Sequence, residues 1–567
     1  MSLLWVLNNL IEAALFGGSC IILAWTLSRW LGALVKQKDD AFKTPCIRSI
    51  LLRPLLVLKA RFDAWSFLIR GPAIIQAAFE KSNGAPFSVD TPSNTIVLVS
   101  DWKHIKEINA APEGTLSLLG AAKEVLQPKH TMSDFNWMDK RGSDGAPLQM
   151  TLRSRLSGYL PVLLPEIRSD LCALLDQRFD SLAVVNGVKQ GAIFPTILGA
   201  VAKSNARALF GAKLSQNPGF LKAATKMIEH TLIIAEILRM VPSIFYDHLG
   251  RFLSSRLNSG KIMTEALTAV VSERFRDREL RKEGYDTPEH NDCIQWIMDH
   301  SPRHKPWGVT RVVHELIAVW FGSVHIASTT ACAAVFDLCD RSEYVDILRQ
   351  EIEQTGWEAF DKSGGQIFPL MDSFMKESAR LNPIESVSTR RKVLKPFRFS
   401  DGTTVQPGQW VCSAPKGMNR IPATWAEADK FYGFRFVKPE VLEQAKQNIK
   451  GLSSGLSSSP SNDSFEIPKG GKPSAYTDLS DWQQWGTGKA SCTGRWYASA
   501  AIKIMLGTLI TKYDIKLVNP EAKRYFSWRT FIYPYESTRI IMEPRPGAEK
   551  VMILRFMLAV VQWNLEQ

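Results

Sequence analysis

The sequence predicts a helix-rich α+β fold with small β-sheets, placed behind one N-terminal transmembrane helix. Long segments with helical apolar spacing occupy most of the 567 residues, and short β-branched runs such as Thr95–Val99 occur between them. An apolar stretch also opens the chain. We expect a membrane anchor over 1–30, a linker over 31–60 and one large domain over 61–567, with a mobile surface loop at 451–475.

The N-terminal stretch from Asn9 to Ser28 is long enough to cross a bilayer core of about 30 Å. No Lys or Arg precedes it, whereas Arg29, Lys36 and Lys38 follow. The positive-inside rule therefore predicts a cytosolic domain. A cleaved signal peptide is the alternative, but such peptides begin with basic residues and this chain does not.

The net charge of +13 is spread along the chain without a basic run. This pattern excludes a typical nucleic-acid-binding tail and fits an anionic membrane surface or an acidic redox partner. The eight cysteines show no paired spacing, which indicates a reducing compartment with buried thiols rather than a disulfide framework.

The first half of the domain is predicted to be mostly helical. A helix should follow Ser100-Asp101 and run through Ile108, and a long loop should cover Ala111–Gly145. Further helices are predicted over Leu148–Phe179, Ile193–Phe210 and Leu221–Met240. The apolar stripe of the last one either packs into the core or covers an apolar substrate pocket.

A very long helix is predicted from its N-cap, Thr310, to about Leu338, which corresponds to roughly 40 Å. Two small residues, Gly322 and Ser323, interrupt its bulky apolar middle. Because Gly costs about 1 kcal/mol relative to Ala in a helix, we expect something to approach closely there.

The second half mixes helix and strand signals. A helix covers Phe374–Arg380, and two short strands between Arg391 and Ser413 flank a turn at Ser400–Gly402. Strands are also predicted at Ile540–Met542 and Val551–Leu554.

A cysteine, Cys492, lies in a loop of small residues that runs from Trp485 to Arg495, and a predicted helix follows at once. The glycines leave room for a large flat partner, and the helix N-terminus favours the thiolate. A thiolate suits a soft metal such as haem iron, whereas the alternative is a buried Cys in a glycine turn. The run 486–491 is not a phosphate loop, because it lacks the first Gly and the Ser or Thr after Lys489.

The order of motifs resembles the cytochrome P450 family. The long helix comes first, then Glu377 and Arg380 as Glu-x-x-Arg, then an aromatic segment with Arg435, and then the Cys492 loop. Trp485 takes the place of the usual Phe. The runs at 432–436 and 485–489 are similar to those of fungal microsomal members.

The resemblance implies a role for each of these residues. Cys492 would be the axial ligand of haem b iron, in a loop shaped by Trp485, Gly488 and Gly494. Glu377, Arg380 and Arg435 would form a structural network bracing that loop. Arg153 and Arg391 are candidate partners of the haem propionates. The residue two positions before the Cys, often basic in the family, is Ala490 here.

The distal helix departs from the family pattern of a small residue, a polar one and then Thr. Gly322 and Ser323 hold the small positions, His325 the polar one, and Ile326 the Thr position. In the family that Thr helps to deliver protons to iron-bound oxygen, which Ile cannot do. Ser323, His325, Ser328, Thr329 or water would have to serve instead.

By resemblance, the chain is expected to be a single-pass monooxygenase of the endoplasmic reticulum membrane. It would oxidise an apolar small molecule of fungal secondary metabolism, such as a terpenoid or alkaloid. Electrons would come from NADPH through NADPH-cytochrome P450 reductase, with cytochrome b5 as a further partner. A haem-thiolate enzyme of rearrangement, coupling or isomerisation is the alternative that Ile326 suggests, and a haem- or steroid-binding protein without activity is a third.

Overall fold

The computed structural model describes residues 47–135, 149, 151–302, 306–452, 465, 467–468 and 472–545. The chain divides into two compact units, 1–66 and 67–567, and each is considered by itself. The predicted membrane span, the predicted strand Val551–Leu554 and most of the predicted mobile loop lie outside the described residues.

Helices dominate the larger unit. The longer ones are α3 (Ile47–Ser82), α4 (Trp102–Ala110), α5 (Leu118–Leu126), α9 (Ser157–Asp180), α10 (Ile193–Phe210), α12 (Pro218–Met240), α13 (Tyr246–Arg256), α14 (Ser259–Lys282), α16 (Val309–Asp340), α17 (Glu343–Thr355), α19 (Pro369–Leu381), α21 (Pro439–Asn448) and α22 (Arg495–Lys512). Short ones are α6 (Pro128–Thr131), α11 (Ala212–Ser215), α15 (Cys293–Asp299), α18 (Trp357–Lys362) and α20 (Pro415–Met418), and a π-helical turn covers Leu152–Leu156.

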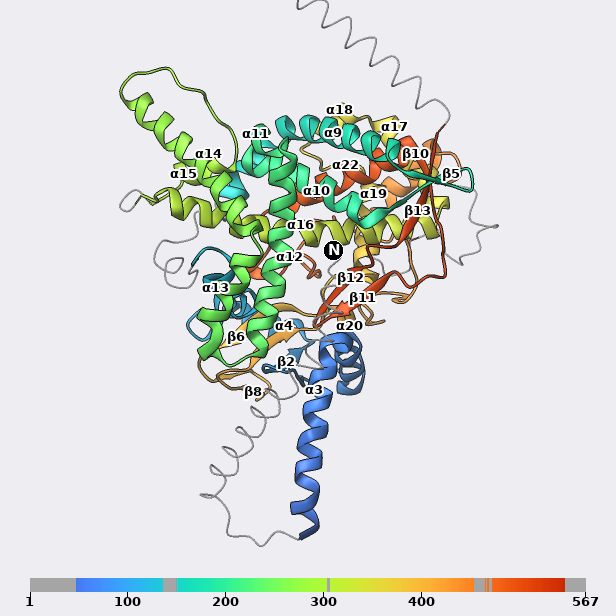
Figure 1. Cartoon of the computed structure of the whole chain (residues 1–567). Helices are drawn as coiled ribbons and strands as arrows, with labels where there is room; N and C mark the ends of the chain where they lie inside the picture. The colour runs from blue at the N-terminus through green and yellow to red at the C-terminus, as the bar shows by residue number, and fades with distance from the viewer. Residues whose placement is uncertain are drawn as a thin grey trace, which may run out of the picture. The chain divides into compact units, whose positions relative to one another are not determined.

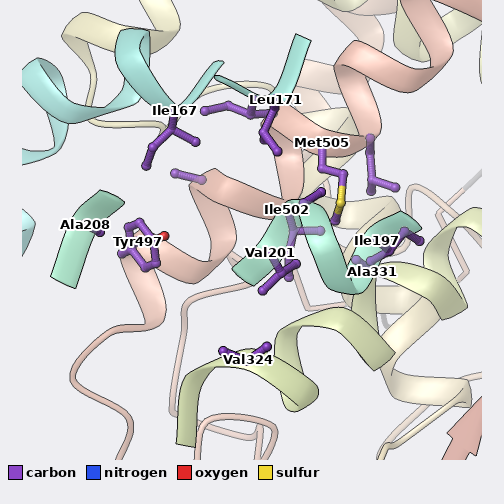
Figure 2. Close-up of a cluster of buried hydrophobic side chains, with 14 of the residues drawn as sticks. Ile167, Leu171, Ile197, Val201, Ala208, Val324, Ala331, Tyr497, Ile502 and Met505 are labelled. Atoms are coloured by element: carbon purple, nitrogen blue, oxygen red, sulfur yellow. The ribbon is translucent and has the colours of Figure 1, made fainter. Parts of the chain in front are cut away.

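The core forms around α16, which crosses the middle of the helical region and packs against α10, α14, α19 and α22 (Figure 1). Figure 2 shows part of this core, where apolar side chains of α9, α10, α16 and α22 converge. Val324 of α16 and Ile502 of α22 are fully buried there or nearly so. This packing fixes α22, which directly follows Cys492, against α16.

The strands form four small sheets among the described residues. One has the order β1 (Phe87–Asp90), β2 (Thr95–Val99), β9 (Trp410–Ser413), β6 (Ser388–Val393) and β3 (Leu116–Ser117), and in it β2 and β9 run parallel. The second has the order β10 (Tyr513–Leu517), β13 (Arg539–Pro544), β5 (Val188–Ala192) and β4 (Ala183–Val185). The others are the hairpins β11 (Tyr525–Trp528) with β12 (Phe531–Pro534) and β7 (Phe397–Arg398) with β8 (Thr404–Val405).

Several sequence predictions are confirmed and others are wrong. The bounds predicted for the strand Thr95–Val99 and the helix Ile193–Phe210 agree with the structure. The predicted loop from Ala111 instead contains β3, α5 and α6. There the Ser117 hydroxyl accepts from the Gly120 N–H at 2.7 Å, a side-chain cap that starts α5 despite its small residues.

The long helix also differs from its prediction. It begins at Val309, after Gly308, so Thr310 lies in its first turn and is not the N-cap. It continues without interruption past Gly322 and Ser323 to Asp340. In the described part of the chain, α16 alone is long and apolar enough to cross a bilayer, but more than half of its most apolar stretch is buried inside the domain. This burial identifies α16 as a core helix.

Candidate functional site

The loop before α22 is closed by a backbone hydrogen bond. The Cys492 N–H donates to the Trp485 carbonyl at 2.6 Å. Gly486 and Gly488 have φ of 72° and 59°, in the left-handed region that favours glycine. A Cβ on Gly488 would lie 2.9 Å from Cγ of Asn109, so the loop needs glycine there for space as well. The indole N–H of Trp485 donates to the Tyr476 carbonyl at 2.7 Å and holds the start of the loop.

The Cys492 side chain is exposed to open space although protein surrounds its position. Burial raises the pKa of the thiol, while the backbone N–H of Gly494 and the charge of Arg495 lower it. Burial has the larger influence, so the pKa of the thiol is raised overall. The thiolate at this position would therefore be stabilised by a further positive partner such as a bound metal ion.

The distal helix α16 also opens onto free space. No protein atom lies within 4 Å of the position that a Cβ on Gly322 would take, and Ile326 is 46 % exposed although it sits in the middle of a core helix. The two residues share one face of α16, four positions apart. Gly494, two residues after Cys492, likewise has nothing within 4 Å.

Two sets of hydrogen bonds connect α16 with the Cys loop and with α22. The Gln484 amide donates to Thr330 Oγ1 at 3.3 Å, and that hydroxyl donates to the Ile326 carbonyl at 3.0 Å. These contacts tie the Cys loop to the turn of α16 that carries Ile326.

The second set passes through Asn205 of α10. Its amide nitrogen donates to Ser323 Oγ at 3.1 Å, and its oxygen accepts from the Tyr497 hydroxyl of α22 at 2.9 Å. Figure 2 shows Tyr497 on α22 among the same helices. Ser323 in turn donates to the Trp320 carbonyl at 3.1 Å. Sequence reasoning missed Asn205, because nothing in its local sequence distinguishes it from other helical polar residues.

His325 lies next to Ile326 with a buried Nδ1 that has no hydrogen-bond partner among the described residues. Burial lowers the pKa of His325 to about 4, so the imidazole is neutral at physiological pH. The hydroxyl of Ser328 donates to the Val324 carbonyl within the helix, at 2.8 Å. Thr329 is buried on the face of α16 that carries Ile326.

The structure brings Glu377, Arg380 and Arg435 together in a fully buried cluster. Arg380 donates to the Glu377 carboxylate from Nε at 2.7 Å and from Nη2 at 2.8 Å, and Arg435 Nε lies 3.0 Å from both carboxylate oxygens. The remaining guanidinium N–H groups donate to carbonyls between Asn419 and Lys430. The cluster therefore fixes the loop 419–435 against α19.

The same helix also reaches the Cys loop directly. Asp372 of α19 accepts from the Tyr476 N–H at 2.7 Å and pairs with Lys503 of α22 at 2.7 Å. Tyr476 is the residue whose carbonyl receives the Trp485 indole. The helix α19 thus contributes to the charged cluster, binds the segment that holds the start of the Cys loop, and contacts α22.

The two candidate propionate partners lie in different settings. Arg391 is buried on β6, and its Nη2 lies 3.3 Å from Asn109 Oδ1. Asn109 also donates to Thr487 Oγ1 of the Cys loop at 2.9 Å, so Arg391 lies two hydrogen bonds away from that loop. Arg153 is exposed, and its charge adds to the effect of burial in lowering the pKa of Arg495.

A helix-rich α+β domain in which an exposed cysteine directly precedes a core helix, packed against a long central helix, fits a haem-thiolate protein. The chain belongs to the cytochrome P450 family, since the family profile described as "Cytochrome P450" matches residues 76–537.

Curated relatives agree with this assignment. Cytochrome P450 monooxygenase 151 of Postia placenta is 25 % identical over 504 residues, covering 87 % of this chain and 93 % of the relative. Cytochrome P450 monooxygenase olcJ of Penicillium canescens is 26 % identical over 520 residues, covering 90 % of each. Cytochrome P450 monooxygenase paxP of Penicillium paxilli is 24 % identical and covers 81 % of this chain and 82 % of the relative.

Solved structures share the fold. The retinoic acid bound cyanobacterial CYP120A1 superposes with a TM-score of 0.58 at 14 % identity, covering 82 % of this chain and 93 % of that one. The cytochrome P450DA heme domain superposes with a TM-score of 0.58 at 13 % identity, covering 84 % and 93 %. The chain is therefore an oxidoreductase of the cytochrome P450 monooxygenase family, and the family implies haem held by a cysteine thiolate.

Proposed function

We propose that this protein is a membrane-bound monooxygenase that oxidises an apolar small molecule of fungal secondary metabolism. Electrons would come from an NADPH-dependent reductase, with cytochrome b5 as a second donor. The proposal is carried by one observation: an exposed Cys492 directly precedes α22, a helix that packs against the central helix α16. Ile326, an exposed apolar residue in the middle of α16, supports an apolar substrate. The relatives that are fungal monooxygenases support the setting.

The residues present fit a haem. Cys492 would ligate the iron, and Gly494 leaves open space beside it. Arg391, which lies two hydrogen bonds from the loop, and the exposed Arg153 are the candidates to pair with propionates. When bound, the haem supplies the activation of dioxygen. The chain itself holds the ligand loop through Asp372, which accepts from the Tyr476 N–H, and Glu377 holds the separate loop 419–435.

Proton supply to the distal side must come from groups other than the residue at position 326, because Ile326 has no hydroxyl. Ser323 donates its only hydroxyl proton to the Trp320 carbonyl and accepts from Asn205. His325 is neutral and carries a single ring N–H proton. To deliver a proton it would have to give up that one and then take another from solvent. We therefore assign proton supply to water that enters the space beside Gly322.

The haem and monooxygenase proposal is tested with the detergent-solubilised full chain. The reduced protein with carbon monoxide should show the absorption band characteristic of thiolate ligation. With a purified fungal reductase, NADPH and ¹⁸O₂, products should carry one ¹⁸O atom. A normal carbon monoxide band together with products free of ¹⁸O would contradict monooxygenation.

The second candidate function is supported by Ile326 itself. An enzyme that rearranges, couples or isomerises its substrate at the haem has less need of a proton donor on the distal side. Ile326 lacks the hydroxyl that the family's usual Thr supplies at this position. Ile326→Thr distinguishes the two. A monooxygenase should gain coupling of NADPH oxidation to product, whereas a rearrangement enzyme should gain wasteful hydrogen peroxide and no product.

A further inference from the structure

A second group of buried charges lies where the C-terminal end of α12 meets the turn of the hairpin β11–β12. Arg529, in the turn, donates to the carboxylate of Glu236 on α12 from Nε at 2.8 Å and from Nη2 at 2.6 Å. The indole of Trp528 donates to the same carboxylate at 3.4 Å. The Arg529 N–H also donates to the Leu68 carbonyl of α3 at 2.7 Å, so the turn is held from two sides.

Two more arginines join this group, which we call the arginine cluster: Arg239, Arg390 and Arg529. Arg239 lies one turn after Glu236 on α12, with Nη1 3.6 Å from that carboxylate. Arg390 of β6 pairs with Glu385 and donates to Thr530 Oγ1 at 3.3 Å. Thr530 in turn donates to Glu385 at 2.8 Å.

The arginine cluster is short of negative charge. It holds three guanidinium groups against two carboxylates, Glu236 and Glu385, and none of these five side chains is more than 23 % exposed. Glu124 is the next carboxylate near Arg239, but Lys392 pairs with it at 2.9 Å.

Two donors of the cluster are also unused. The Nε–H groups of Arg239 and Arg390 are buried and have no acceptor in the part of the chain that the structure describes. Burial and the neighbouring Arg529 charge lower the pKa of Arg239 to about 10. A buried charge without its counter-charge is costly, and so is a buried donor without an acceptor. Both costs disappear when an anion with two acceptor oxygens occupies the cluster.

We propose that the arginine cluster binds the carboxylate of the substrate, so that the enzyme acts on an apolar molecule bearing one carboxylic acid group. The inference rests on the proposed function, of which it names the substrate class. Ile233 and Met240 share a helix face with Glu236 and are only partly buried, so apolar surface for the rest of such a molecule adjoins the cluster. The planar fork of Arg matches a carboxylate, whereas an alcohol or amide offers no charge to it.

Isothermal titration calorimetry on the full-length holoenzyme tests the proposal with two matched pairs, dodecanoate with dodecanamide and abietate with abietamide. At least one acid should bind tenfold or more tightly than its amide. Arg239→Gln should bring that acid to the affinity of the amide and leave amide binding unchanged, and Arg239→Lys should keep part of the preference. Lys261→Gln, which removes a 71 % exposed charge on α14, should change neither affinity.

Equal affinity for acid and amide in both pairs, or no binding of either acid, would overturn the proposal, as would a preference that survives Arg239→Gln. The haem propionates are the other source of carboxylate. If Arg239→Gln and Arg390→Gln lower haem content while the acid preference persists, the cluster serves the haem and the proposal is wrong. Calorimetry measures binding and does not depend on turnover. If the acid preference is absent but the carbon monoxide band is normal, the carboxylate proposal is wrong and the proposed function is unaffected.

Discussion

Replacing Glu377 by Gln tests the charged cluster that holds the loop 419–435 against α19. The Glu377 side chain is fully buried and accepts hydrogen bonds from Arg380, Arg435 and the Tyr432 N–H. Gln has nearly the same shape but no charge, and its NH₂ group would face guanidinium donors. Both arginines would then be buried without a counter-charge, a loss of about 3–5 kcal/mol.

This loss converts into a measurable shift of the melting temperature. With an unfolding entropy of about 2.1 cal/mol/K per residue, a unit of roughly 500 residues has about 1 kcal/mol/K, so Glu377→Gln should lower Tm by about 3–5 °C. Circular dichroism at a fixed scan rate gives the shift, because a protein of this size can unfold irreversibly. Haem retention should fall in parallel, since α19 also holds the Cys loop.

Glu358→Gln is the matched control, because Glu358 pairs with Lys362 on the surface and its side chain is 83 % exposed. Exposed pairs contribute little, so this variant should melt within about 1 °C of the wild type. The reasoning is refuted if Glu377→Gln shifts Tm by less than 1 °C, or if the two variants shift it equally.

Other expected outcomes concern the loop, its anchors and pH. Cys492→Ser should abolish the thiolate-type carbon monoxide band while the circular dichroism spectrum stays unchanged; survival of the band would remove Cys492 as the ligand. Asn205→Leu removes the acceptor of the Tyr497 hydroxyl and the donor to Ser323, and it should cost about 1–3 kcal/mol in urea unfolding; a change below 0.5 kcal/mol would show that the bridge is not formed. Gly488→Ala should lower haem retention because its Cβ would clash with Asn109. Gly494→Ala should lower the thermal stability of the haem-free protein less than Gly488→Ala does. Equal losses of stability in the two variants would contradict the geometry. Burial raises the pKa of Glu351 to about 7, so the folded state binds a proton that the unfolded state has lost. The stability of the wild type relative to Glu351→Gln should therefore fall as pH rises from about 4.5 to 7, by at most about 1.4 kcal/mol per unit, and a flat or rising difference would be inconsistent with this burial.

The sequence predicted elements best where a local pattern decides them. The β-branched run Thr95–Val99 and the apolar period of Ile193–Phe210 each match the structure at both ends. Within the predicted loop Ala111–Gly145, prediction failed over the described residues 111–135, because α5 depends on a side-chain cap at Ser117 and on packing against β6 rather than on a strong helical pattern of its own. Thr310 was wrongly chosen as N-cap because a cap depends on where the backbone turns, and it turns at Gly308.

The residues of the candidate site were also predicted only in part. Cys492, Glu377, Arg380 and Arg435 were predicted because Glu-x-x-Arg, the aromatic run with Arg435 and the Cys loop follow one another in the order that the family has. Asn109, Asn205 and Asp372 were not, since their partners lie far along the chain. Asn109 and Thr487, for example, are 378 positions apart.

By itself, the sequence determined the family and the helix-rich fold and pointed to Cys492 as the proposed haem ligand, because these depend on short motifs and on periodicity along the chain. Only the tertiary structure decided which side chains are buried together. It showed that Ser323 is engaged by Asn205 and that Arg239, Arg390 and Arg529 share two carboxylates. The physical reason is that hydrogen bonds and uncompensated charge depend on distance in space and on burial, which arise only when distant segments pack.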